Sequence, residues 1–276
     1  MRIVVTGGSG FIGQHIVANL VAGGHDVVSA DRSLGRQAGA KSAVVDLRVR
    51  ESAYPLFEGA DSIVHLANHP NAGRADAQTV LAENLTINTN VCQAAAELGV
   101  RRIVFASSIQ AMADSLSAGP LPADGDTPAR PDNVYGLSKI LTEHMLAHYV
   151  RLHGLSAVAV RFPWVAGRKR HLEYLNNTAE FHGRHTRELG AWLWIEDAAS
   201  LVAAILATDL PGFRVYLPSA ALPTSFGPVD ELARRLYPDA PQKRPDEPLT
   251  ALIDTGQITR ETGWKPRTIE QVLALA

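Results

Sequence analysis

The sequence predicts an α/β fold in which a parallel sheet is doubly wound, with helices on both faces. Short apolar runs without polar alternation, typical of strands covered on both sides, alternate with helix-length segments through the first 160 residues. A glycine-rich turn joins the first of these strands to the first helix. Alternation of this kind favours right-handed crossovers in one parallel sheet.

The elements follow one another in a regular order. The expected strands are residues 2–6, 26–30, 43–45, 62–66, 102–106 and 157–160. The clearest helical segments between them are residues 11–22, 79–98 and 134–153. Residues 113–132 contain four prolines and two glycines, so we expect an irregular and functional loop there.

The later part of the chain is richer in proline and shows one clear helix, at 195–207. We therefore expect two units. Residues 1–165 would form the main α/β domain, and residues 166–276 a smaller substrate-binding lobe with parts that return to the sheet. The length of 276 residues suits one large or two modest domains.

Composition excludes several classes of protein. With 26 Lys and Arg against 28 Asp and Glu, the net charge of −2 gives no basic field for nucleic acid or an anionic membrane. No run reaches the 18 or so apolar residues of a membrane span, and no signal-peptide core follows Met1. Cys92 is the single cysteine, which agrees with a reducing compartment. We expect a cytoplasmic protein that acts on small molecules.

The turn at residues 6–13 has the spacing of a dinucleotide-binding loop. Gly7 permits a tight turn, Gly10 lets the backbone approach a pyrophosphate, and Gly13 lets helix and strand pack closely. Asp31 lies 18 residues beyond Gly13, near the spacing at which a carboxylate binds the adenosine ribose. A carboxylate there favours NAD over NADP, although the guanidinium of Arg32 could accept a 2′-phosphate.

Tyr135 and Lys139 are four residues apart, on one face of the predicted helix. A tyrosine with a pKa of about 10 is a poor base at neutral pH, and a nearby ammonium favours its phenolate form. Ser107 and Ser108 end a strand at the carboxyl edge, where ligands of open α/β sheets bind. One of these hydroxyls could orient a substrate oxygen.

Taken together, these residues give the chain a resemblance to the extended short-chain dehydrogenase/reductases, the NAD-dependent epimerase/dehydratase group, which have a Rossmann-type fold. The resemblance covers almost the whole length. Its motifs are residues 6–13, Asp31, Asp46-Leu47, His65-Leu66-Ala67, Asn84, Ala106-Ser107-Ser108, Tyr135–Lys139 in YGLSK, Arg161-Phe162-Pro163, Ile195-Glu196-Asp197 and Gly263-Trp264-Lys265-Pro266.

The resemblance implies roles for individual residues. Ser108 would polarise the substrate oxygen, Tyr135 would act as acid and base, and Lys139 would bind the nicotinamide ribose and tune the tyrosine. The expected cofactor contacts are Gly7, Gly10, Phe11, Ile12, Gly13, Asp31, Arg32, Asp46, Leu47, Leu66, Ala67, Asn84, Ala106, Tyr135, Lys139 and Pro163. The expected substrate contacts are Asn68, Ser108, Gln110, Trp164 and Arg187.

The substrate stays open at this point. A sugar or sugar-nucleotide hydroxyl suits the family, but Trp164 stands where nucleotide-sugar epimerases usually carry Asn. A uronate-type dehydrogenase is an alternative, because Arg187 matches a carboxylate-binding arginine of that group. A non-catalytic NAD(P) sensor is a further alternative. We expect no metal site, and the family implies a homodimer through residues 79–98 and 134–153.

Overall fold

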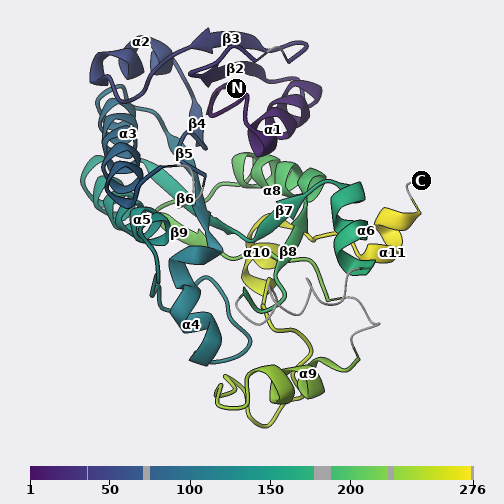
Figure 1. The fold of residues 1–276 in the computed structure, drawn as a ribbon. Helices are drawn as coiled ribbons and strands as arrows, with labels where there is room; N and C mark the ends of the chain where they lie inside the picture. Colours follow the sequence, from purple (N-terminus) through teal and green to yellow (C-terminus); the bar gives the residue numbers. More distant parts are fainter. Residues whose placement is uncertain (36, 71–74, 177–187, 223–226, 275–276) are drawn as a thin grey trace.

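The protein is built around a seven-stranded sheet in which every neighbouring pair of strands is parallel. The computed structural model describes residues 1–35, 37–70, 75–176, 188–222 and 227–274. The strand order is β3-β2-β1-β4-β5-β6-β9, so the sheet is doubly wound from β1 (Figure 1). The strands are β1 Arg2–Thr6, β2 Asp26–Asp31, β3 Lys41–Val44, β4 Ser62–His65, β5 Arg102–Ser108, β6 Ser156–Phe162 and β9 Phe213–Tyr216.

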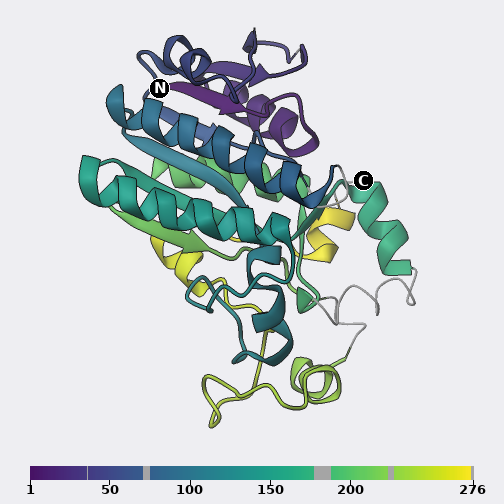
Figure 2. The ribbon, with the colours of Figure 1, turned by 60° about the vertical axis from the view of Figure 1, so that its left-hand side comes forward.

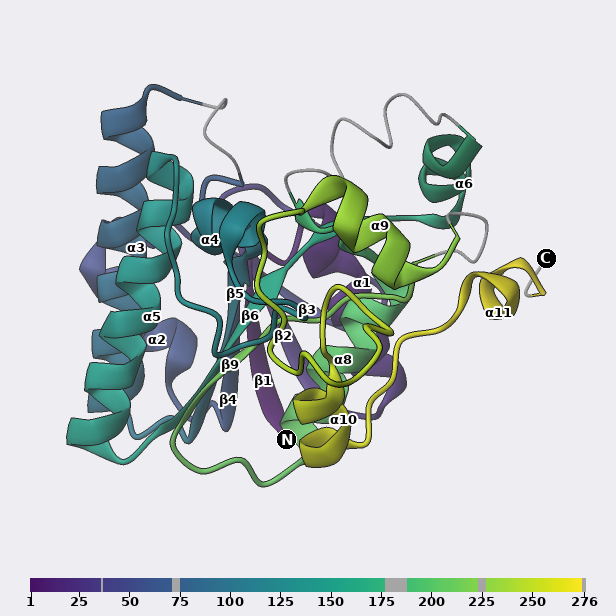
Figure 3. The same cartoon turned by 90° about the horizontal axis from the view of Figure 1, so that it is seen from below.

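Helices cover both faces of this sheet. On one face lie α2 (Ala53–Phe57), α3 (Ala77–Glu97) and α5 (Val134–His153), with α3 and α5 side by side (Figures 2 and 3). On the other lie α1 (Phe11–Ala22) and α8 (Ile195–Ala207). In the described chain, none of the helices is both long and apolar enough to cross a membrane.

Local signals in the sequence set the ends of the long helices. The Asp76 carboxylate accepts a hydrogen bond from the Thr79 N–H and caps α3. The Asn133 side chain does the same for the Gly136 N–H at the start of α5, at 2.9 Å. At the other end of α5, Gly154 adopts φ of 70°, the left-handed conformation that ends many helices.

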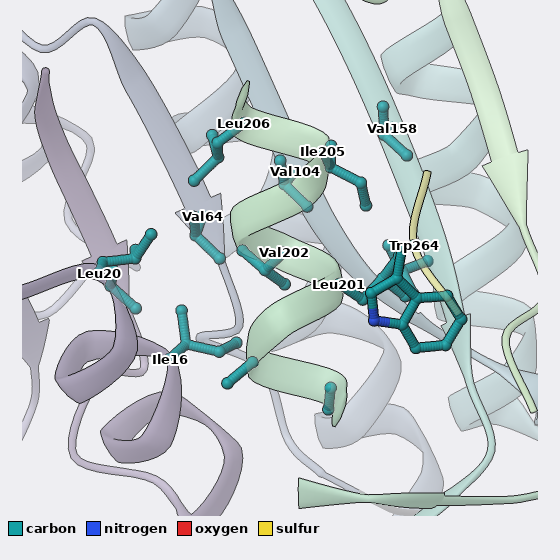
Figure 4. Close-up of a cluster of buried hydrophobic side chains, with 14 of the residues drawn as sticks. Ile16, Leu20, Val64, Val104, Val158, Leu201, Val202, Ile205, Leu206 and Trp264 are labelled. Atoms are coloured by element: carbon teal, nitrogen blue, oxygen red, sulfur yellow. The ribbon is translucent and has the colours of Figure 1, made fainter. Parts of the chain in front are cut away.

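The core on the α1 and α8 face joins distant parts of the chain. Figure 4 shows Ile16 and Leu20 from α1 and Val202 from α8 packed over apolar side chains of β4, β5 and β6, with the ring of Trp264 at the edge of the cluster. All of these side chains are buried. The segment after residue 166 therefore supplies both a helix layer and the edge strand β9 to the main sheet.

A second group of elements lies outside the seven-stranded sheet. Its elements are β7 (Trp164–Ala166) paired with β8 (Trp192–Trp194), α6 (Arg168–Asn176), α9 (Val229–Leu236), α10 (Gly256–Thr262) and α11 (Ile269–Leu273). Bridges from Leu121 to Gln242 and from Ala123 to Ile253 tie the proline-rich loop to the late segment. The division into units at residue 165 stays a prediction, because later residues build both layers.

The fold class predicted from sequence is confirmed, but the prediction for residues 113–132 is wrong in part. Residues 113–132 were expected to hold no regular structure, but Ala113–Ala118 form the helix α4 after the short 3-10 helix Ile109–Met112. The prolines and glycines of this stretch begin only at Gly119. The six residues before them therefore offer no obstacle to a helical turn. A second 3-10 helix, Arg50–Ser52, precedes α2.

Candidate active site

A cleft of about 690 Å³ opens at the carboxyl edge of the sheet, around the reversal of strand order between β1 and β4. This is the position at which open α/β sheets bind ligands, and the volume is ordinary for a small-molecule site. The cleft runs from the glycine turn and Asp31 at one end to Tyr135, Ser108 and Trp164 at the other. One continuous space therefore joins the two motifs that the sequence singled out.

The glycine turn is shaped so that only glycine fits at two of its positions. Gly7 has φ of 70°, and a Cβ on it would lie 2.8 Å from the backbone of Leu66 and Ala67. A Cβ on Gly13 would lie 2.2 Å from the Gly7 carbonyl oxygen. Gly10 is the N-cap of α1 and gives it no side-chain cap, so the first N–H groups face the cleft without a competing side chain. This cradle fits a pyrophosphate.

Two acidic residues flank the adenosine end. The Asp31 carboxylate accepts a hydrogen bond from the Ser9 N–H at 3.1 Å, which braces the glycine turn. Asp46 is held by Arg48 through contacts of 2.6 to 3.1 Å, and this hydrogen bonding lowers the Asp46 pKa to about 2. Both oxygens of the Asp46 carboxylate already accept hydrogen bonds from Arg48, so an adenine amino group bound there would share these acceptors with Arg48. Arg32 lines the same end of the cleft.

Tyr135, Ser108 and Lys139 meet at the other end. Asn133 starts α5 just before Tyr135, so the phenol and Lys139 lie on successive turns of one helix. The Lys139 Nζ lies 5.3 Å from the centre of the Tyr135 ring and donates hydrogen bonds to Asn68 Oδ1 and the Ala106 carbonyl, both at 2.8 Å. Ser108 lies at the end of β5, and its hydroxyl accepts from the Gln110 N–H at 3.2 Å.

Burial dominates the electrostatics of this group. Burial raises the pKa of the Tyr135 phenol to about 12, and the hydrogen bond with Ser108 opposes that rise. Burial also lowers the pKa of the Lys139 ammonium to about 7, opposed by the charge of Glu143. The sequence led us to expect that Lys139 lowers the tyrosine pKa. In the structure the Lys139 ammonium is directed at Asn68 and Ala106. The loss of water around the buried phenol therefore dominates, and the Tyr135 pKa rises.

The two adjacent serines have different surroundings. The Ser107 hydroxyl donates to Glu143 Oε1 at 2.5 Å, away from Tyr135. Glu143 is buried and receives two further hydrogen bonds from the guanidinium of Arg161, at 3.1 and 2.8 Å. Arg161 in turn donates to the Thr127 carbonyl at 3.0 Å. This arrangement leaves Ser108 as the serine beside the phenol and ties the proline-rich loop to α5.

Most residues predicted from sequence line this one cleft, although lining does not itself establish binding. These are Gly7, Gly10, Phe11, Ile12, Gly13, Asp31, Arg32, Asp46, Leu47, Leu66, Ala67, Asn68, Ala106, Ser108, Gln110, Tyr135, Lys139, Pro163 and Trp164. Asn84 is not among the lining residues; its side chain accepts from the His69 N–H at 2.7 Å and donates to Ser138 Oγ at 3.1 Å. Arg187 falls outside the described residues.

The sequence reading missed several residues that line the cleft. His69 Nε2 lies 2.8 Å from Glu83 Oε2, and Glu83 also binds Arg48 at 2.7 Å. The signal was available: Glu83 and Ile87 are one turn apart on α3, and both line the cleft. Glu188 also lines the substrate end. Nothing in the spacing of the sequence singled it out.

His171 lies behind Trp164, buried against three tryptophan rings. Its ring centre is 4.6, 5.0 and 4.5 Å from those of Trp164, Trp192 and Trp194. Burial lowers the pKa of His171 to about 4. Across the described ranges, no group of three His, Cys, Asp or Glu side chains is arranged to hold a metal ion. Trp192 and Trp194 belong to a buried cluster against which Trp164 of the cleft packs.

The chain is similar in sequence to several known proteins. The NAD dependent epimerase/dehydratase family matches residues 3–216. The L-arabinose 1-dehydrogenase (NAD(P)(+)) of Haloferax volcanii is 33% identical over 59% of this chain and 67% of its own. The uronate dehydrogenase of Pseudomonas syringae pv. tomato is 25% identical over 78% of this chain and 72% of its own.

A similar fold is found in solved structures. A UDP-galactose 4-epimerase superposes with a TM-score of 0.71 and 28% identity, covering 99% of this chain and 96% of that one. Among the curated relatives, the chain spans only about half the length of a GDP-mannose 3,5-epimerase from Oryza sativa and a UDP-glucose 4-epimerase from Streptomyces lividans.

Proposed function

Since this chain belongs to the NAD dependent epimerase/dehydratase family, we propose that it oxidises a hydroxyl group of a sugar or sugar nucleotide, with NAD as the cofactor. The observation that carries this proposal is the single cleft that joins the glycine turn to Tyr135, Ser108 and Lys139. A dinucleotide bound by its pyrophosphate at the turn would place its nicotinamide toward the phenol. NAD, when bound, supplies a hydride acceptor for the carbinol carbon.

The residues of the chain divide the remaining work. The Tyr135 Oη accepts the proton of the substrate hydroxyl. The Ser108 hydroxyl donates a hydrogen bond to the substrate oxygen and stabilises the negative charge that develops there. Lys139, when protonated, favours the phenolate form of Tyr135 and offers an N–H to the ribose hydroxyls. Release of the resulting ketone or lactone gives net oxidation, whereas its reduction from the opposite face gives epimerisation.

The burial of Tyr135 has a direct role in this scheme. A phenol with a pKa near 12 stays protonated at neutral pH, which suits an acid in the reverse direction. For oxidation, the positive charge of a bound oxidised cofactor and the ammonium of Lys139 would both favour the phenolate. We infer that the phenol becomes a base only in the loaded cleft, which protects the unloaded enzyme from an unpaired buried anion.

A panel of substrates tests this proposal. Purified protein is mixed with NAD and either free aldoses including L-arabinose, free uronates, or UDP- and GDP-sugars, and both NADH absorbance and products are measured. NADH formed with a free sugar identifies a dehydrogenase, and an isomerised nucleotide sugar without net NADH identifies an epimerase. The Tyr135→Phe variant should lose at least about a thousandfold in kcat and keep its NAD affinity.

The uronate alternative has one observation in its favour. The uronate dehydrogenase relative matches 78% of this chain, a larger share than the arabinose dehydrogenase does. In this reading Arg187 would bind the sugar carboxylate through two parallel hydrogen bonds. The uronate alternative would be favoured if the protein oxidises uronates and Arg187→Lys weakens this activity mainly by raising KM. No turnover with any class, together with tight NAD binding, would favour the sensor alternative and overturn the enzyme.

A further inference from the structure

A line of polar side chains, all buried except the half-buried Asn68, runs from β1 to α5 and reaches the wall of the cleft. Thr6 Oγ1 lies 2.7 Å from His65 Nδ1, and His65 Nε2 lies 2.8 Å from Asn88 Oδ1. Asn68 Nδ2 donates to the same Asn88 oxygen at 2.7 Å. Asn68 Oδ1 then accepts from Lys139 Nζ at 2.8 Å. The line therefore connects the strand before the glycine turn to the lysine of the active site.

The direction of each hydrogen bond in this line is fixed at its far end. The Thr142 hydroxyl donates to the Ser138 carbonyl at 2.8 Å, so its oxygen is left to accept from Asn88 Nδ2 at 2.6 Å. The amide of Asn88 is thereby oriented, and its Oδ1 faces His65 and Asn68. Because that oxygen only accepts, the proton of neutral His65 is on Nε2, and Thr6 donates to Nδ1.

The same logic fixes Asn68. Its NH₂ group donates to Asn88 Oδ1 and to the Ala67 carbonyl, at 2.7 and 2.5 Å. Its oxygen must then face Lys139, where a flipped amide would place N–H groups against an ammonium. The Ala106 carbonyl accepts a second N–H of Lys139. Two of the three ammonium N–H groups are thus held by the protein, and one is left for a ligand.

We propose that Asn68 is a positioning residue that holds and charges Lys139, instead of the substrate contact that the sequence suggested, and that His65 and Asn88 set its orientation. This inference rests on the proposed function, since it assigns Asn68 a part in the Tyr135 reaction. The geometry points to it because both ends of the Asn68 amide are occupied by protein groups. An amide so engaged has little capacity left for a sugar hydroxyl.

Three titratable groups face Lys139 and enter the test. Tyr135 and Glu143 lie on its own helix, and His65 lies on β4. Burial lowers the pKa of His65 to about 3, so the ring stays neutral across the working range. Glu143 favours the charged lysine, and Asn68 and Ala106 are its uncharged acceptors. Removing the Asn68 oxygen therefore makes the ammonium less stable.

The first experiment measures Lys139 directly in the cofactor-free protein. Lysine side chains are labelled with ¹³C at Cε, the Lys139 resonance is assigned with Lys139→Arg, and its pKa is obtained by NMR titration. We expect Asn68→Ala to lower this pKa by about one pH unit and Asn68→Asp to raise it by about one pH unit. Gln110→Ala, which changes a residue that lines the cleft but does not contact Lys139, should leave the Lys139 pKa unchanged. A wild-type value in both Asn68 variants overturns the proposal.

The second experiment separates positioning from substrate binding. The pH profile of kcat is recorded for wild type and Asn68→Ala with the best substrate of the panel. A positioning role predicts that Asn68→Ala shifts the profile and lowers kcat about tenfold at neutral pH, with sugar KM within about twofold. A higher KM with an unmoved profile would make Asn68 a substrate ligand. If no substrate turns over, the proposed function fails, while the NMR titration still decides the role of Asn68.

Discussion

Tyr135 illustrates how a single side chain takes its chemistry from its surroundings. Its phenol lies within reach of Ser108 and one helical turn from Lys139, yet burial raises its pKa to about 12. The helical spacing predicted the proximity of the lysine correctly. It could not predict where the ammonium points, because Asn68 reaches Lys139 from the loop after β4 and the Ala106 carbonyl reaches it from β5.

The Ser108→Ala substitution tests the coupling of the two hydroxyls. The hydrogen bond with Ser108 lowers the Tyr135 pKa, so its loss raises that pKa and leaves less phenolate at any pH below it. Oxidation needs the phenolate, and the rise of kcat/KM with pH should therefore move upward by about one pH unit. Steady-state rates between pH 6 and pH 10, about the range in which enzymes are assayed, would show the shift. Ser107→Ala, whose hydroxyl faces Glu143, should keep the rise at its original pH; equal shifts in both variants would argue against the coupling.

At the scale of elements, periodicity predicted most of the architecture. The helices α1, α5 and α8 begin and end where the sequence placed them. Asn133 and Gly154 mark the two ends of α5, whereas α1 and α8 have no side-chain cap and were recognised from their apolar residues. The strand β9 was not predicted, since Phe213–Tyr216 is short and lies between prolines. Its partner β6 decides its conformation, and four residues alone carry too little signal.

The candidate site was predictable where the motif contains the geometry. The glycine spacing places its backbone at the cleft, and the four-residue spacing of Tyr135 and Lys139 places both on one helical face. Asn84 was predicted as a cofactor contact, and in the structure its amide is bonded to the His69 N–H and to Ser138 Oγ. Such partners come from separate elements, and only the tertiary structure brings them together.

The turn that opens α1 gives a prediction about close packing. In Gly13→Ala the new methyl would meet the Gly7 carbonyl oxygen at 2.2 Å and the Gly8 Cα at 2.8 Å, both backbone atoms that cannot rotate away. The turn must open, and we expect the NAD Kd to rise about tenfold or more and the protein to lose about 1–3 kcal/mol of stability. NADH fluorescence titration and thermal unfolding measure the two effects.

Gly167→Ala serves as the matched control for this substitution, because its added methyl would have no atom within 4 Å. We expect it to bind NAD and to unfold as the wild type does. If Gly13→Ala also bound NAD with wild-type affinity, the glycine turn would not be the pyrophosphate site.

At the scale of the whole molecule, residues 1–165 and the later residues share one apolar core, and a polar line crosses the first of these parts. His65 lies in the middle of that line with both ring nitrogens engaged. Because burial lowers the pKa of His65 to about 3, this side chain stays neutral in the folded protein at pH values where it is protonated in the unfolded chain. The stability of the fold is thereby linked to pH.

Acid should destabilise the protein well before its carboxylates are neutralised. Between the ordinary histidine pKa of 6.5 and about 3, the unfolded chain binds a proton at His65 that the folded one does not, so stability falls as pH falls. The slope from this group is about 1.4 kcal/mol per pH unit, and His171 adds to it in the same direction. Urea unfolding at several pH values measures the slope. His153→Gln, at an exposed site, should leave it unchanged; constant stability from pH 6.5 down to about pH 4 would contradict the argument.

The exposed face of α5 gives a prediction about assembly. Leu141 and Leu152 are 38% and 53% exposed and lie eleven residues apart, about three helical turns, on one face. We infer that this face pairs with a second copy, as the family resemblance implied. Leu141→Arg should convert a dimer into monomers in analytical ultracentrifugation. Leu34→Arg, at an exposed leucine after β2, should not; a wild type that sediments as a monomer would refute the inference.

The strand β9 and the helix α8 have a practical consequence for anyone who wishes to dissect this protein. Ending the chain near residue 165 would remove β9, the outer neighbour of β6, and would expose the apolar side of α1 that packs against α8. An unpaired strand edge and an exposed apolar surface both promote aggregation of the truncated protein. Residues 1–165 are therefore not a detachable module, because β9 and α8 complete their sheet and their apolar core.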